Sequence, residues 1–400
     1  MDWFLLLLVI GVTAFGGLMI YSTGINETAS NYWFGHLLLG GIGVFIALTL
    51  SRWRYEPLIQ WHWVIYAVSS ALLIAVKFVG SAGGGAVRWL NIFGFNLQPS
   101  EFAKLALIIT LAALLHKRPA NTLGGLFSAL TITAFPWALV FIQPDLGTSL
   151  AFGAITLGML YWGNANPGWL ILLLSPAVSA VLFSVYLPAW LIWLLGVAII
   201  AWMTLPWRFP GTAIATTVNF VAGGLGKLVW QNVLADYQKA RLTVFLDPTQ
   251  DLQGSGYQLH QSRIAIGAGQ LWGRGLHEGT QTQLNFVPEQ HTDFIFSAVG
   301  EELGFIGCIA LLVAFWLIFV RLVMIALSAN DDFGSLLAVG VLSMVAFQVI
   351  INVSMTIGLA PITGLPLPWM SYGRSALLTN FLSIGLVESV ANFRQKRRKY

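Results

Sequence analysis

Long apolar segments separated by short polar ones occupy almost the whole chain. Most of them are long enough for an α-helix to cross the roughly 30 Å hydrocarbon core of a bilayer. The pattern predicts membrane spans at 3–21, 33–50, 60–79, 102–115, 124–142, 147–162, 169–186, 189–206, 294–320, 335–358 and 371–390. A weaker span at 211–230 is loosened by three glycines. We therefore predict an all-α polytopic membrane protein with about twelve spans.

One long segment, 231–292, is polar and Gly-rich between apolar neighbours. Its charged residues and those directly after it include Lys239, Arg241, Asp247, Asp251, Arg263, Arg274, Glu278, Glu289, His291 and Asp293. A chain this apolar has little reason to keep these residues together unless they meet something polar. Carboxylates and cations mixed beside a bilayer predict a site for a phosphate- or sugar-bearing substrate at the membrane surface.

Composition agrees with this picture. Hydrophobic residues make up 57% of the chain and charged ones 9%, with a mean hydropathy of +0.77. The net charge of +4 does not indicate nucleic-acid binding, because basic residues gather in the last seven positions, as in an anchor on anionic lipid. The single cysteine, Cys308, excludes an internal disulfide.

The distribution of basic residues predicts the topology. Twelve spans place both termini on one side of the membrane. Arg52, Arg54, Lys117, Arg118, Arg208 and Arg321 fall on the same side as the basic tail. Short loops opposite, such as 24–31 and 360–368, contain no Lys or Arg. The positive-inside rule therefore puts the termini in the cytoplasm and segment 231–292 outside.

Charged residues inside apolar segments cost about 2.5–3.5 kcal/mol each and are functional candidates. Glu101 and Lys104 are three residues apart, so they share a helical face and can pair. A purely structural interpretation makes Ser100 a helix cap and Glu101 a partner of the helix dipole. That interpretation does not explain Lys104, which lies one turn deeper.

Three further acidic residues, Asp145, Glu301 and Glu302, lie towards the predicted outer ends of helices. Asp145 is well placed to cap the helix that follows it, and we favour this over a phosphate site at the helix N-terminus. Glu301 and Glu302 lie roughly 12 Å into a predicted span. We expect one of them to be protonated or paired with a basic residue such as Lys104, and at least one to be functional.

Two segments predict local structure near the site. Three prolines in 361–368 cannot continue a helix, so we predict a re-entrant loop that forms one wall of the site. Residues 257–266 predict a short amphipathic helix with Gln258, Gln261 and Ser262 on its polar face.

Several strings occur together and in a characteristic order. They are Arg88-Trp89-Leu90, QPSEFAKL from Gln98, QPDLGTS at 143–149, the long run from Arg241 to Gly304, and GLAPITGLPLPWMSYG at 358–373. This set resembles the SEDS family, named after shape, elongation, division and sporulation. The form of the 361–368 loop resembles the elongation branch of that family more than its division branch.

The resemblance implies a fold of ten core transmembrane helices and a large extracytoplasmic loop in a single integral membrane domain, 1–400. The region 169–230 is longer than the family pattern, by about the length of a helical hairpin, so we expect an inserted pair of helices there. The last motif also departs from the pattern, with Arg374 where the family has glycine. A phosphate contact and outward snorkelling are equally good interpretations of Arg374.

The implied activity is that of a peptidoglycan glycosyltransferase of the bacterial cytoplasmic membrane. Such an enzyme polymerises lipid II on the outer face, with inversion to a β-1,4 linkage, during cell elongation and rod-shape maintenance. The resemblance assigns the catalytic role to Asp251, with Asp247 as the competing base. The expected substrate-binding residues are Arg88, Glu101, Lys104, Asp145, Arg241, Gln261, Arg263, Glu289, His291, Asp293, Glu301 and Ser371. A divalent cation, Mg²⁺ or Mn²⁺, is an open expectation.

The expected partners are lipid II, a class B penicillin-binding protein and other membrane proteins of the elongation complex. A lipid II flippase or other transporter is the alternative function, because many spans and intramembrane charges also describe transporters. The polar residues gather at one face rather than near the midplane, which favours the enzyme.

Overall fold

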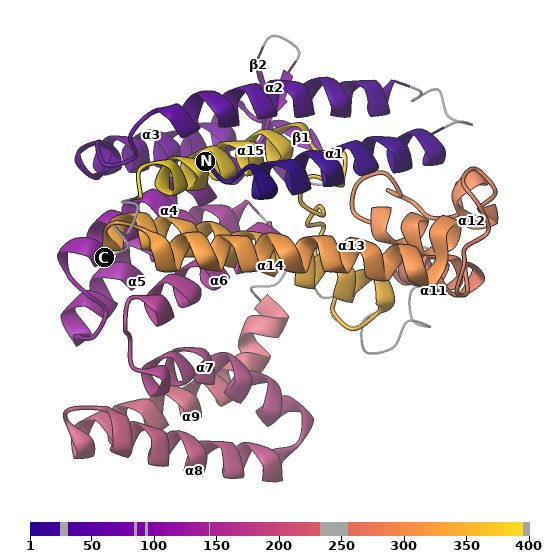
Figure 1. The fold of residues 1–400 in the computed structure, drawn as a ribbon. Coiled ribbons are helices and arrows are strands. Elements are labelled where there is room, and N and C mark those ends of the chain that lie inside the picture. The colour runs from indigo at the N-terminus through magenta and orange to yellow at the C-terminus, as the bar shows by residue number, and fades with distance from the viewer. Residues whose placement is uncertain (25–30, 84–85, 93–94, 144, 233–254, 395–400) are drawn as a thin grey trace. The chain divides into compact units, whose positions relative to one another are not determined.

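The computed structural model describes residues 1–24, 31–83, 86–92, 95–143, 145–232 and 255–394. The chain divides into two compact units, and each is described by itself (Figure 1). The first comprises 1–117, 128–159 and 240–400, and the second comprises 118–127 and 160–239.

The first unit is a helical bundle. Its helices are α1 (Trp3–Thr23), α2 (Tyr32–Arg52), α3 (Leu58–Val79), α4 (Pro99–Lys117), α11 (Ser255–Ala268), α12 (Thr280–Gln283), α13 (Ile295–Ser328), α14 (Asp332–Ile357) and α15 (Arg374–Asn392). It also contains most of α5 (Leu123–Ile142) and α6 (Leu146–Trp162). Helix α4 is largely buried between α3, α14 and α15, while α1 packs on α2 and α13.

Close helix packing depends on glycine at several contacts. Helix α2 packs along α15, and a Cβ added to Gly43 would lie 2.3 Å from a ring carbon of Phe381. No larger residue fits there without displacing one of the helices. Small residues are the usual means by which membrane helices approach one another.

Each of the twelve predicted spans coincides with one of these helices or with a helix of the second unit. Among the described residues, nine helices are long and apolar enough to cross a membrane, which makes the chain a polytopic membrane protein. Helices α6, α9 and α15 are not among the nine. The count of twelve spans therefore stays a prediction.

A small antiparallel sheet corrects the all-α expectation locally. Its strands are β1 (Ser81–Gly83), β2 (Ala86–Ile92) and β3 (Phe95–Leu97), in the order β1-β2-β3. Strand β2 pairs with both of its neighbours and carries Arg88 and Trp89, which line the cavity described below.

Helix α13 is interrupted at Gly304, whose φ of 66° is outside the helical range. Residues 270–275 run beside this interruption. The N–H groups of Arg274 and Gly275 donate to the carbonyls of Glu301 and Glu302, at 3.0 Å each. The 24 residues after Gly304 are by themselves sufficient to span the hydrocarbon core.

The second unit contains α7 (Pro167–Val185), α8 (Leu187–Thr204) and α9 (Arg208–Asn232), which pack on one another. Buried polar side chains connect them. Trp190 donates to the Ser179 hydroxyl at 2.7 Å, and Asn219 donates to the Ser175 hydroxyl at 2.8 Å. This unit includes the region 169–230 in which the inserted pair was expected, and the single-domain description of the chain stays a prediction.

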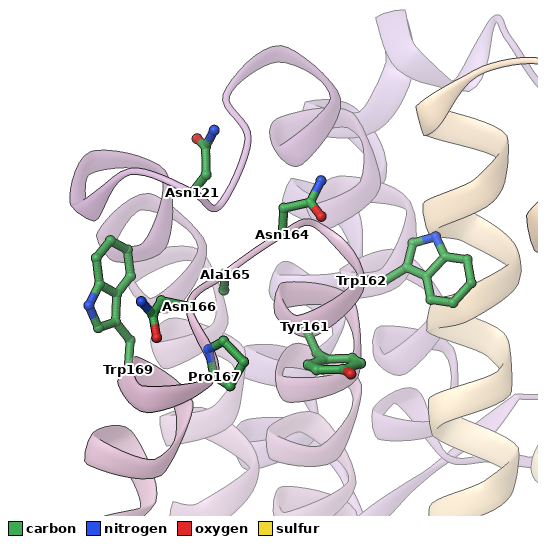
Figure 2. A pocket seen from close by; sticks show the side chains of 8 residues that line it. All are labelled: Asn121, Tyr161, Trp162, Asn164, Ala165, Asn166, Pro167 and Trp169. Atoms are coloured by element: carbon green, nitrogen blue, oxygen red, sulfur yellow. The ribbon is translucent and has the colours of Figure 1, made fainter. Parts of the chain in front are cut away.

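The second unit also carries an open pocket of about 730 Å³ where α6 ends and α7 begins (Figure 2). Its lining residues are Asn121, Tyr161, Trp162, Asn164, Ala165, Asn166, Pro167 and Trp169. None of them is charged, and none belongs to the predicted substrate-binding set. The pocket therefore differs in chemistry from the expected site.

Candidate functional site

The polar segments singled out in the sequence meet around one cavity of about 430 Å³ in the first unit. The strand β2, the start of α4, the start of α6, helix α11, the turn before α13, the 358–373 loop and the start of α15 all contribute. The lining side chains are Arg88, Trp89, Gln98, Glu101, Asp145, Thr148, Gln258, Glu289, Thr292, Asp293, Phe294, Ile362, Gly364, Leu365, Pro366, Tyr372, Gly373, Ser375 and Ala376.

The floor of the cavity contains a buried ion pair. Lys104 Nζ lies 2.9 Å from Glu101 Oε1, and the two side chains are 0% and 3% exposed. The second carboxylate oxygen of Glu101 has no hydrogen-bond partner among the described residues. Glu101 also lines the cavity, although this oxygen is itself buried. Ser100 is not the helix cap of the purely structural interpretation, because α4 already begins at Pro99.

Asp145 caps α6, as predicted. Its Oδ1 accepts from the Thr148 N–H at 3.2 Å and its Oδ2 accepts from the Thr148 hydroxyl at 2.9 Å. The same Oδ2 accepts from the Gln98 side chain at 3.2 Å. Asp145 therefore joins α6 to the segment that begins α4 while it lines the cavity.

The non-helical loop predicted at 361–368 is confirmed as a wall of the cavity. Asn352 of α14 holds it, since its side-chain amide donates to the carbonyls of Leu365 and Asp293, both at 2.8 Å. A Cβ added to Gly147 of α6 would lie 2.7 Å from the Thr363 carbonyl oxygen. The loop therefore lies directly on the start of α6.

The turn before α13 supplies two acids. Glu289 is exposed, with φ of 54°, and its Oε2 accepts from the Thr292 hydroxyl at 2.9 Å. Glu289, Thr292 and Asp293 all line the cavity. The predicted group of acids at this turn is thus brought to Glu101 and Asp145.

Glu301 and Glu302 do not pair with Lys104, so that alternative was wrong, whereas the predicted pair of Lys104 with Glu101 is confirmed. Glu301 accepts from the N–H groups of Gln281 and Thr282 at 2.8 and 2.9 Å. Glu302 accepts from the Ser22 hydroxyl at 2.7 and 2.6 Å. Both carboxylates are buried, and they hold residues 281–282 and the end of α1.

Other candidates lie away from the cavity wall. Gln261 and Arg263 are on α11 but do not line it, and the exposed Arg263 lies close to Gly358. Ser371 stabilises its own turn, because its hydroxyl accepts from the Leu367 N–H at 2.8 Å. His291 stacks on Tyr32 beside the cavity. Their substrate-binding roles stay predictions.

Helix α11 confirms the short helix predicted at 257–266, but Ser262 does not lie on an exposed polar face as predicted. Ser262 is buried, and its hydroxyl lies 2.7 Å from the Ser297 hydroxyl and donates to the Thr356 carbonyl. Gln258 does line the cavity. Sequence reasoning missed Gln98, Thr148, Tyr372 and Ser375 as lining residues, although each lies within or beside a motif that had been noted.

Three candidate residues from the sequence, Arg241, Asp247 and Asp251, lie outside the described residues. The divalent cation also stays a prediction. Carboxylate oxygens are the ligands that Mg²⁺ prefers, and four carboxylates line the cavity. Within the described ranges, however, no three His, Cys, Asp or Glu side chains are close enough to hold one ion together.

The family model for FtsW, RodA and SpoVE, described as a cell cycle protein, matches residues 2–195 and 189–396. The chain belongs to the FtsW/RodA/SpoVE family. This confirms the resemblance inferred from the motifs.

Named relatives cover nearly the whole chain. A probable peptidoglycan glycosyltransferase FtsW of Trichlorobacter lovleyi is 33% identical over 98% of this chain and 93% of its own. The peptidoglycan glycosyltransferase RodA of Treponema pallidum is 33% identical over 98% of each chain. The peptidoglycan glycosyltransferase MrdB of Escherichia coli K12 is 32% identical over 96% of this chain and 92% of its own. Relatives named FtsW and relatives named RodA or MrdB are thus similarly close to this chain.

Solved structures support the fold. A chain from a study of the coordination of polymerization and crosslinking by a peptidoglycan synthase complex matches with a TM-score of 0.75. It is 26% identical and covers 98% of this chain and 99% of that one. The rod shape determining protein RodA of Thermus thermophilus matches with a TM-score of 0.65 at 24% identity, over 99% of this chain and 98% of that one. The latter supports the fold alone.

Proposed function

We propose that this protein polymerises lipid II into glycan strands at the outer cavity, as a peptidoglycan glycosyltransferase. The observation that carries the proposal is the meeting of the polar segments around one cavity, in a family whose relatives are named for this activity. The cavity is lined by carboxylates, amides, hydroxyls and aromatic rings. Such side chains suit a sugar with many hydroxyl groups.

The reaction joins two lipid-linked disaccharides. The 4-hydroxyl oxygen of the acceptor's GlcNAc forms a bond to the anomeric carbon of the donor's MurNAc. The bond from that carbon to the pyrophosphate oxygen breaks, and undecaprenyl pyrophosphate leaves. Because an α-linked donor becomes a β-1,4 product, a single displacement with inversion accounts for the stereochemistry.

The acceptor hydroxyl must lose its proton during the attack, and a carboxylate within hydrogen-bond reach is a suitable base. We assign this role to Asp251 from the family motif. Asp247 ranks second, because an Asp-Pro pair is a common turn element. Glu101 has a different role in this proposal, since it lines the cavity and is held in place there by its ion pair with Lys104.

The leaving pyrophosphate requires positive charge. Arg88 lines the cavity, and Arg241 and Arg263 are the other arginines that the sequence offers. Four carboxylates line the described wall, against the guanidinium of Arg88 and the ammonium of Lys104 that pairs with Glu101, so acids outnumber cations there. A divalent cation between those carboxylates and the pyrophosphate would restore the balance, and we propose Mg²⁺ or Mn²⁺ for that role.

The proposal places the protein in the bacterial cytoplasmic membrane, with both termini in the cytoplasm and the cavity facing outward. A class B penicillin-binding protein is the proposed partner. The similarity to a chain of a peptidoglycan synthase complex that polymerises and crosslinks supports this pairing. Other elongation-complex membrane proteins are proposed from the sequence motifs alone.

One reconstitution separates the polymerase from the flippase alternative. The purified protein, with its proposed partner, is placed in liposomes that carry fluorescent lipid II. Gel electrophoresis then detects glycan chains, and an impermeant reducing agent detects lipid II that has crossed the bilayer. We expect chains without accelerated crossing. Crossing without chains would instead support the flippase.

A further inference from the structure

Three rings lie beside the cavity, and the proposed mechanism does not use them. Tyr32, the first residue of α2, stacks on His291 with ring centres 5.0 Å apart and planes at 28°. It also stacks on Tyr372, at 4.7 Å and 29°. These residues come from distant parts of the chain, so the cluster is a product of the fold.

The three rings form one cluster, because the ring centres of His291 and Tyr372 are themselves only 6.3 Å apart. Tyr32 is nevertheless 36% exposed, so part of its side chain remains accessible.

Hydrogen bonds hold the ring cluster in place, and one of its rings lines the cavity. The Tyr372 N–H donates to the His291 carbonyl at 2.9 Å, and Arg374 Nε donates to the Tyr372 hydroxyl at 3.0 Å. Tyr372 itself lines the cavity, as does Thr292, the neighbour of His291. A chain of sugars that extends out of the cavity would pass this ring.

A pyranose ring presents polarised C–H groups on one face, and the negative face of an aromatic ring attracts them. We propose that Tyr32, backed by His291 and Tyr372, is a stacking platform for a pyranose ring of the glycan strand next to the cavity. The inference rests on the proposed function, because it assumes that a glycan occupies the cavity. It also gives Arg374 a role, which is to hold Tyr372 in place.

The chain offers a matched control. Tyr21, at the end of α1, is 43% exposed and makes edge-on contacts to Trp33 and His277, with ring centres 5.5 and 5.4 Å apart. It does not line the cavity. Loss of this ring should perturb local packing as much as loss of Tyr32, without removing a sugar contact.

The test measures binding and polymerisation separately. Saturation-transfer NMR or calorimetry follows a soluble tetrasaccharide of alternating GlcNAc and MurNAc on the purified full-length protein. Tyr32→Ala should weaken binding by about threefold to tenfold, the value of one aromatic contact. Tyr32→Phe and Tyr21→Ala should bind like the wild type. In polymerisation assays, Tyr32→Ala should raise KM for lipid II and shorten the chains.

The outcomes separate the platform from the proposed function. Unchanged tetrasaccharide binding in Tyr32→Ala, or an equal loss in Tyr21→Ala, would overturn the platform even if the wild type polymerises lipid II. An equal loss in Tyr32→Phe would also overturn it, because that variant keeps the ring face. A wild type that binds the tetrasaccharide through Tyr32 but makes no chains would support the platform and contradict the polymerase.

Discussion

The ammonium of Lys104 and the carboxylate of Glu101 lie 2.9 Å apart on one face of α4, and almost no solvent reaches either side chain. Only one oxygen of Glu101 is used by the pair. The pair therefore fixes the Glu101 side chain, which lines the cavity, in one orientation.

Breaking this pair should destabilise the protein. Lys104→Met leaves the Glu101 carboxylate buried without its partner, which typically costs about 3–5 kcal/mol of unfolding free energy. Adding Glu101→Gln should recover most of that stability but not the activity. Thermal unfolding in detergent measures the coupling. Glu301→Gln is the control and should show no coupling to Lys104→Met, because Glu301 is bound to backbone N–H groups of 281 and 282. Strict additivity with Glu101→Gln would contradict the pair.

The contact between α6 and the 358–373 loop predicts a difference between two glycines of one helix. A Cβ at Gly147 would meet the Thr363 carbonyl oxygen at 2.7 Å, whereas nothing lies within 4 Å of one at Gly153. Gly147→Ala should lower stability by about 1–3 kcal/mol and reduce polymerisation. Gly153→Ala should be neutral or stabilising. Equal melting temperatures for the two variants would refute the close contact.

The hydrogen bonds of Glu301 predict how strongly residues 279–283 are held in the fold. Glu301→Gln removes one acceptor from the N–H groups of Gln281 and Thr282, at a cost of about 1–3 kcal/mol. Hydrogen exchange of residues 279–283 should accelerate, with little change in α4. Glu278→Gln, at an exposed carboxylate, is the matched control. Unaltered hydrogen exchange of residues 279–283 in Glu301→Gln would show that the Glu301 carboxylate does not hold this segment.

The sequence motifs predicted which segments line the site, but they did not predict the detailed contacts of individual side chains. Apolar length identified the helices, and the prolines of 361–368 identified the loop, because both depend on local chemistry. The Lys104 alternative for Glu301 and Glu302 was wrong because a buried acid can accept from backbone N–H groups, as Glu301 does, or from a hydroxyl, as Glu302 does. Those N–H groups come from 281–282 and carry no sequence signal. The burial of Ser262 depends on tertiary contacts to α13 and α14 in the same way.

The proposed topology can be tested with described positions on either side. In a Cys308→Ser background, Glu278→Cys should react with an impermeant thiol reagent in intact cells. Asn330→Cys, in the connection between α13 and α14, should react only after lysis. Both side chains are exposed. Labelling of Asn330→Cys in intact cells would place that connection outside and reverse the assignment.

The most direct measurement of the central claim compares glycan chains made from lipid II by the purified wild type and by Asp251→Asn, with Asp247→Asn alongside. If Asp251 is the base of an outer-face polymerase, the wild type should produce a ladder of chains and Asp247→Asn should retain one. Asp251→Asn should produce none, with its melting temperature unchanged. A normal yield from Asp251→Asn would remove Asp251 as the base, and the absence of chains from the wild type would contradict the polymerase itself.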